Sequence, residues 1–126
     1  MAKFSDSALL KTKTRGMIYI DLFSGYGQPS TTQIVMKNIQ GQEELLMSFD
    51  GNVTHHELGS ARKLKYNKLE IRTTIHDVHD NPIEKIDMSL SIKVFDLDAS
   101  EVETNFSMKT IGMGTILYSD FHITIM

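Results

Sequence analysis

Apolar and polar residues alternate most regularly along residues 86–94. Apolar residues occupy every second position there, and Asp, Ser and Lys occupy the positions between them. A period of two is typical of a β-strand with one face on the core and the other in water. Residues 69–75 show the same alternation, with Leu69, Ile71 and Ile75 on one face. The two segments together predict a hairpin whose connection is the sequence HDVHDNP.

Five further segments predict strands because they are rich in β-branched and aromatic residues. They are residues 17–23, 33–39, 44–49, 115–118 and 121–125. The sequences between the strands favour turns. They include SGYGQPS, LGS and the dipeptide Ser119-Asp120. Asp50-Gly51 is the strongest signal for a tight hairpin.

Helix is expected only in short pieces. Ser100 and Glu103 have capping-box spacing and could begin one or two turns, and residues 5–10 could form another. A change of parity between Leu64 and Leu69 requires a bulge or turn near Asn67. Seven or eight short strands then predict an all-β fold. It would be an antiparallel two-layer sandwich or a small barrel, with at most one or two short helices.

The composition is that of one globular domain spanning residues 1–126. Of the 126 residues, 40% are hydrophobic and 23% charged, and there is no Cys, which excludes disulfides and thiolate chemistry. No apolar run approaches the roughly 18 residues of a membrane span or the core of a signal peptide. We therefore expect a soluble protein of the cytoplasm or a virion interior that is not secreted. Residues 1–15 are expected to form a partly mobile N-terminal arm.

Charge is unevenly distributed along the chain. Lys and Arg number 13 against 16 Asp and Glu, a net charge of −3 that argues against coating nucleic acid over the whole surface. Cations cluster near the N-terminus and in ARKLKYNKLEIR, whereas residues 76–103 are acidic. The candidate residues for contact with a polyanion or an acidic partner are Lys11, Lys13, Arg15, Arg62, Lys63, Lys65, Tyr66, Lys68 and Arg72. The alternative is a solvated strand whose Lys residues protect a sheet edge.

The connection HDVHDNP contains residues that bind metals and residues that favour turns. His76 and His79 could converge in a loop, and Asp77 or Asp80 could add an oxygen ligand. Adjacent residues such as His55 and His56 cannot both face one ion from a strand. Asn81-Pro82 starts turns for backbone reasons, so a polar hairpin tip without metal is favoured. We expect no cofactor and no catalytic residue, with a metal-dependent enzyme at His76 and His79 as the weaker alternative.

Three short stretches, GMIYIDLFSG, KTIGMG and NPIEK, resemble the matrix proteins of bornaviruses. The resemblance implies a non-enzymatic β-sandwich protein that forms tetramers and lattices. It also implies association with the inner membrane leaflet and contact with single-stranded RNA. The acidic net charge departs from the usual basic matrix protein.

The sequence thus predicts a non-enzymatic structural or assembly protein that self-associates as a homo-oligomer. Unpaired strand edges are a common route to oligomers. The alternative is a small binding module that contacts RNA, an anionic lipid surface or an acidic protein through its basic residues.

Overall fold

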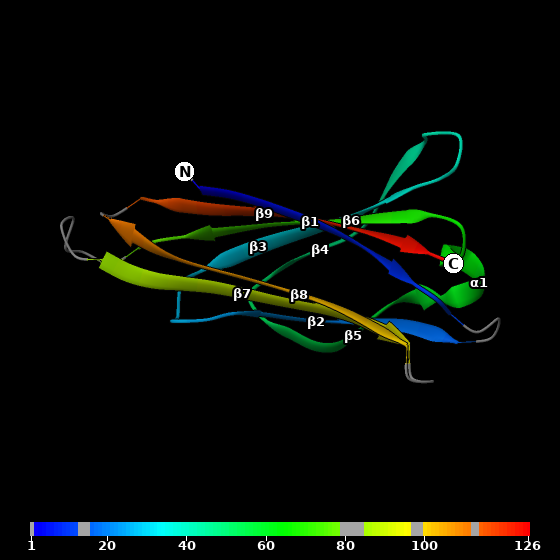
Figure 1. The fold of residues 1–126 in the computed structure, drawn as a ribbon, viewed down its shortest axis with the longest axis horizontal. Coiled ribbons are helices and arrows are strands. Elements are labelled where there is room, and N and C mark those ends of the chain that lie inside the picture. The colour runs from blue at the N-terminus through cyan, green and yellow to red at the C-terminus, as the bar shows by residue number, and fades with distance from the viewer. Residues whose placement is uncertain (1, 13–15, 79–84, 97–99, 112–113) are drawn as a thin grey trace.

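A computed structural model describes residues 2–12, 16–78, 85–96, 100–111 and 114–126. Within this part of the chain, the fold is a sandwich of two β-sheets with one short helix (Figure 1). The elements in chain order are β1 (Ala2–Leu10), β2 (Met17–Ser24), β3 (Ser30–Lys37), β4 (Glu43–Asp50), β5 (Val53–Ser60), α1 (Ala61–Leu64), β6 (Lys68–His76), β7 (Lys85–Asp96), β8 (Glu101–Ile111) and β9 (Ile116–Ile125). The predicted all-β sandwich is confirmed.

The five-stranded sheet has the strand order β1-β9-β6-β3-β4, and the four-stranded sheet has the order β5-β2-β7-β8. The pairing is antiparallel except between β1 and β9, which run parallel. Edge strands β1 and β8 lie against one another across the two layers. The Thr104 hydroxyl donates to the Asp6 carboxylate at 3.0 Å, and the rings of Phe4 and Phe106 lie 5.4 Å apart.

The core lies between the sheets and is built from the alternating positions that the sequence predicts. On β6, Leu69, Ile71 and Ile75 are fully buried, and Leu90 and Ile92 of β7 belong to the same core from the other sheet. The side chains that the alternation on β6 and β7 predicts to point inward are therefore confirmed as buried.

The predicted hairpin between β6 and β7 is wrong. β6 pairs with β3 and β9 in the five-stranded sheet, whereas β7 pairs with β2 and β8 in the other. Asp50-Gly51 likewise joins β4 to β5 across the two sheets and forms no hairpin. Gly51 keeps the expected positive φ of 76°, but its N–H donates to the Ser30 carbonyl. Asp50-Gly51 is therefore a turn, as predicted, but the two strands that it connects do not pair with one another.

Other local predictions are also corrected. Residues 5–10 lie in strand β1 and Glu103 lies in strand β8. Ala8 and Leu10 of β1 and Val102 of β8 pack at the edge of the core, which favours strand over helix in both segments. Ser119 and Asp120 lie within β9, so the two strands predicted there are one. LGS ends β5, and α1 follows it directly. No helix in the described ranges is long and apolar enough to cross a bilayer.

Candidate functional site

Helix α1 and the turn after it place the basic segment at one end of the sandwich. The Ser60 hydroxyl accepts the N–H of Lys63 at 3.1 Å and so caps the helix, while Ala61 and Leu64 are buried. After the helix, Tyr66 adopts a positive φ of 68°, and its N–H donates to the Ile125 carbonyl at 2.7 Å. The chain thereby turns into β6 at residue 68, which confirms the turn expected near Asn67.

The turn exposes the Tyr66 ring beside several cations. The ring is 62% exposed, and the Lys65 ammonium lies 5.5 Å from its centroid. Tyr66 and Lys68 line a shallow hollow of about 330 Å³ together with Lys37 and Ile39. We name Lys37, Ile39, Lys65, Tyr66 and Lys68 the α1-end surface.

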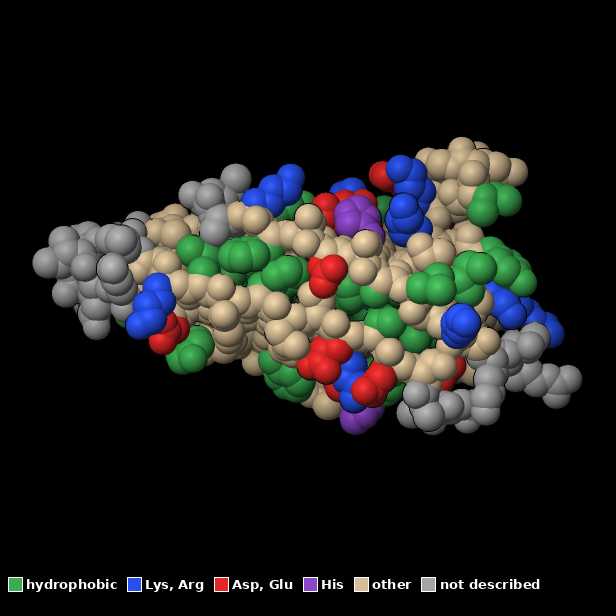
Figure 2. All heavy atoms as spheres, viewed as in Figure 1, with side chains coloured by type: hydrophobic (Ala, Val, Ile, Leu, Met, Phe, Trp, Pro, Cys, Tyr) green, Lys and Arg blue, Asp and Glu red, His purple; other side chains and the backbone are tan. Residues whose placement is uncertain are grey.

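The loop between β3 and β4 supplies the apolar part of the α1-end surface. Figure 1 shows this loop projecting beyond the body of the sandwich. Ile39 at the loop is 86% exposed, and the Asn38 carboxamide fixes the loop by accepting the N–H groups of Gln40 and Gln42. Figure 2 shows hydrophobic side chains at this end of the molecule with Lys and Arg side chains close by.

Strand register extends the α1-end surface onto the outer face of the five-stranded sheet. Lys37 pairs with Lys68, Lys68 with Thr124, and Thr124 with Leu9, so the four residues form one row across the sheet. Leu9 is 50% exposed in this row. Glu43 lies 4.0 Å from Lys37 and offsets part of the positive charge.

The structure places the candidate residues from the sequence in three groups. Lys65, Tyr66 and Lys68 belong to the α1-end surface, and Lys11, Arg62 and Lys63 are exposed. Lys13 and Arg15 lie outside the described residues. Arg72 is separate, because its guanidinium binds Glu70 on the outer sheet face.

Sequence reasoning missed Lys37 and Ile39. The sequence KNIQGQ could have revealed them, because it places a single Ile between turn-forming residues, directly after a Lys and an Asn. Such a pattern predicts an apolar side chain at the tip of a loop.

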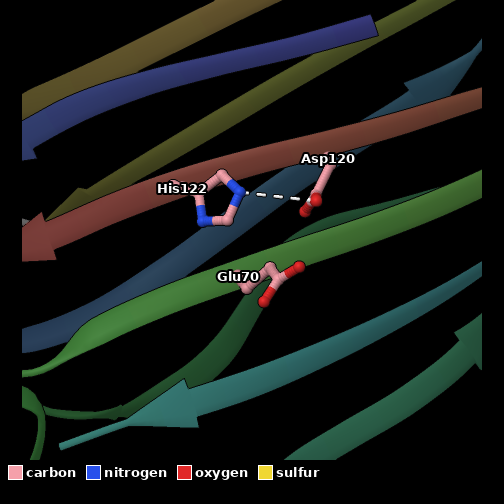
Figure 3. Close-up of side chains that lie close together, drawn as sticks. All are labelled: Glu70, Asp120 and His122. Atoms are coloured by element: carbon pink, nitrogen blue, oxygen red, sulfur yellow. Dashed lines mark ion pairs between the residues drawn. The ribbon is translucent and has the colours of Figure 1, made fainter. Parts of the chain in front are cut away.

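A second polar cluster occupies the outer face between β6 and β9 (Figure 3). Arg72 donates to both carboxylate oxygens of Glu70, at 2.8 and 2.9 Å. On β9, His122 Nε2 lies 3.4 Å from Asp120 Oδ2. Cross-strand pairing sets Glu70 opposite His122 and Arg72 opposite Asp120. The side chains of Glu70 and Asp120 are only 16% and 17% exposed.

The pKa values of the two carboxyl groups in this cluster, Glu70 and Asp120, are shifted in opposite directions. The hydrogen bond from Arg72 lowers the pKa of Glu70. Burial raises the pKa of Asp120, and the adjacent Glu70 carboxylate raises it further. Burial also raises the pKa of Tyr118, which precedes Asp120 on the same face. Glu70, Asp120 and His122 bring one donor atom each to within 4.8 Å of one another, which makes them the described group able to hold a metal ion.

The sequence HDVHDNP differs from the polar hairpin tip that was expected. His76 is exposed at the end of β6, as the alternation predicts. Asp77 is 1% exposed and accepts a hydrogen bond from the Thr110 hydroxyl of β8. This buried contact forms because the chain passes between the two sheets at this point. His79, Asp80 and Asn81-Pro82 lie outside the described residues.

The fold and the α1-end surface define an all-β sandwich protein with a basic and aromatic end. Comparison with protein-family models, curated proteins and solved structures found no match to the chain.

Proposed function

We propose that this protein is a non-catalytic binding domain that docks on an anionic lipid surface through the α1-end surface. The observation that carries the proposal is Tyr66. A side chain other than Gly at φ 68° costs roughly 1–2 kcal/mol of strain. The fold keeps a Tyr there with its ring largely in water, beside Lys65 and Lys68. Tyr26 has a similar φ and exposure, so it is the position of Tyr66 beside Lys65, Lys68 and Ile39 that supports a role in binding.

The chemistry of the α1-end surface favours lipid over nucleic acid. Aromatic rings and Lys side chains are suited to the headgroup region, and each Lys near an anionic leaflet contributes about 1 kcal/mol of attraction. Ile39 is 86% exposed beside these cations, so its apolar side chain is free to enter the acyl boundary. A single-stranded nucleic acid would use the Tyr66 ring for stacking but would gain nothing comparable from Ile39 or Leu9.

Vesicle sedimentation tests this proposal. The protein should sediment with vesicles of phosphatidylserine and phosphatidylcholine at low salt, and less at high salt. The double variant Lys65→Glu/Lys68→Glu should lose this binding. A matched control, Lys3→Glu/Lys109→Glu, makes the same change in net charge on exposed residues of β1 and β8 and should bind like the wild type.

Two results would contradict the proposal. Equal binding by both double variants would remove the α1-end surface from consideration. Binding to a single-stranded RNA oligonucleotide without binding to anionic vesicles would replace lipid by RNA as the partner.

Self-association is the second candidate function. Within the described residues, the 11-residue strand β8 pairs with β7 alone, so the backbone groups of its other edge have no strand partner, although β1 packs beside that edge at Asp6 and Phe4. A strand of a second copy that displaces or extends this contact could pair there. Light scattering should then show oligomers whose mass grows with protein concentration. A monomer at high concentration and low salt would exclude assembly through this edge.

A further inference from the structure

We propose that Glu70, Asp120 and His122 form a binding site for one divalent transition-metal ion, with Zn²⁺ as the best-matched ion. The site is independent of the α1-end surface and of its proposed function. It lies on the outer face of the five-stranded sheet, where Figure 3 shows Asp120 and His122 on β9 and Glu70 beside them on β6.

The first argument is convergence. Three donor groups of two chemical kinds, an imidazole and two carboxylates, meet within 4.8 Å. Two neighbouring strands hold them, and Glu70 and His122 are direct cross-strand partners. An ion bonded at about 2.0–2.2 Å to all three would draw the donor atoms to roughly 3–4 Å apart.

The second argument is the state of Asp120. Among the described residues, its Oδ1 atom is sealed from solvent and receives no hydrogen bond from an N–H or hydroxyl donor, and the adjacent Glu70 carboxyl group is a hydrogen-bond partner of the Asp120 side chain. Its Oδ2 atom has the imidazole of His122 at 3.4 Å. A carboxylate that has lost water next to a second carboxylate is costly unless a cation or a proton compensates it. The side chain is 17% exposed, so an ion can still reach it from the solvent.

The third argument is charge. Arg72 neutralises one of the two carboxylates and binds both oxygens of Glu70, yet each oxygen keeps a second lone pair. With a neutral imidazole, the Glu70, Arg72 and Asp120 group carries a net negative charge that a cation would balance. Arg72 would then act as a positioning residue that fixes the Glu70 carboxylate.

The donor set also selects the ion. Imidazole nitrogen together with carboxylate oxygen suits Zn²⁺, whereas Mg²⁺ prefers oxygen ligands and keeps several waters. Three protein ligands leave a fourth position open, so the bound ion would also hold water or an external anion.

Metal retention after dialysis tests this inference. The protein is equilibrated with Zn²⁺, dialysed, and assayed for metal by mass spectrometry and for Zn²⁺ affinity by calorimetry. We expect one Zn²⁺ per chain and no retained Mg²⁺ in a parallel sample. His122→Gln and Asp120→Asn should each weaken Zn²⁺ binding by at least about tenfold. Loss of a residue that only hydrogen-bonds a metal ligand already weakens metal affinity by roughly 10–100-fold. His76→Gln, an exposed His on the same strand as Glu70, is the matched control and should bind like the wild type.

Each contrary result overturns the assignment. No retained Zn²⁺ would show that a proton compensates Asp120. Zn²⁺ retained equally by His122→Gln, or lost instead in a His55→Gln/His56→Gln variant, would place the ion elsewhere. Folding is checked separately: Zn²⁺ should raise the melting temperature of the wild type and of His76→Gln, and leave that of Asp120→Asn unchanged while its circular dichroism stays native.

Discussion

At the scale of single residues, Tyr66 and Asp120 stand out because each occupies an environment that disfavours it. Tyr66 has a backbone conformation that suits Gly, and Asp120 is a largely buried carboxylate beside another. The sequence identified Tyr66 through its basic neighbours. It did not identify Asp120, because Ser119-Asp120 also has the composition of a turn, and its proximity to Glu70 depends on strand pairing between distant segments.

Replacing Tyr66 by Gly should separate stability from binding. Tyr66→Gly relieves the positive φ and should leave the free energy of unfolding unchanged or raise it by up to about 1 kcal/mol. The same variant should bind anionic vesicles more weakly. Tyr26→Gly is the matched control, because Tyr26 has φ 64° and is 65% exposed in the loop between β2 and β3. It should gain similar stability and keep full binding; weakened binding there would point to a general effect of ring loss.

Asp120 should make metal-free protein less stable as the pH rises. Because burial raises its pKa above the usual 3.8, the folded state holds the proton more tightly than the unfolded state. Its stabilising contribution is present at acid pH and is lost as the pH rises through the raised pKa. The Asn side chain of the Asp120→Asn variant does not titrate. In the presence of a chelator, the variant should therefore gain unfolding free energy relative to the wild type as the pH rises above the usual Asp pKa of 3.8, measured in urea titrations. A pH-independent difference would contradict the shift.

At the scale of elements, the period-two pattern predicts strands and inward faces but not partners. The alternation in β6 and β7 is correct, yet each strand pairs within a different sheet. Two half-buried strands in sequence fit a hairpin and a crossing between layers equally well. β1 was missed because Asp6 interrupts its inward apolar positions, and at the sheet edge that carboxylate accepts the Thr104 hydroxyl. In β8 a short capping-box signal obscured an alternation of inward residues that includes Val102, Phe106 and Met108.

The crossing after β6 should depend on the contact between Asp77 and Thr110. Thr110→Val keeps the shape of the side chain but removes a hydroxyl donor to a buried carboxylate. We expect a loss of about 1–3 kcal/mol in the free energy of unfolding, measured in urea. Thr31→Val is the control, because the Thr31 hydroxyl donates to Asp50 on the exposed surface. It should change stability by less than about 0.5 kcal/mol. Equal effects of the two substitutions would show that the buried contact does not fasten β6 to β8.

At the scale of the whole molecule, the charged segments of the sequence predict only part of the distribution of charge over the surface. The basic segment 62–68 does collect at one end, where it meets Lys37 and Ile39 from a hairpin distant in sequence. In residues 85–96 and 100–103, the described main part of the acidic segment 76–103, the charges do not form an opposing surface of one sign. Lys93 pairs with Glu101 at 3.1 Å, and Lys109 pairs with Asp87 at 3.5 Å, so part of its charge is neutralised on the four-stranded sheet.

A single Trp reporter in the loop between β3 and β4 is the sharpest test of docking through the α1-end surface. The chain contains no Trp, so Ile39→Trp introduces one indole at the 86% exposed position. Docking through Ile39 should shift the indole emission to the blue with phosphatidylserine vesicles and leave it unchanged with phosphatidylcholine alone. Val78→Trp places the reporter just beyond the other end of β6, at a 57% exposed position, and its emission should not change. An unchanged Ile39→Trp spectrum on vesicles that sediment the protein, or a shift at Val78→Trp instead, would show that the α1-end surface does not dock on the lipid.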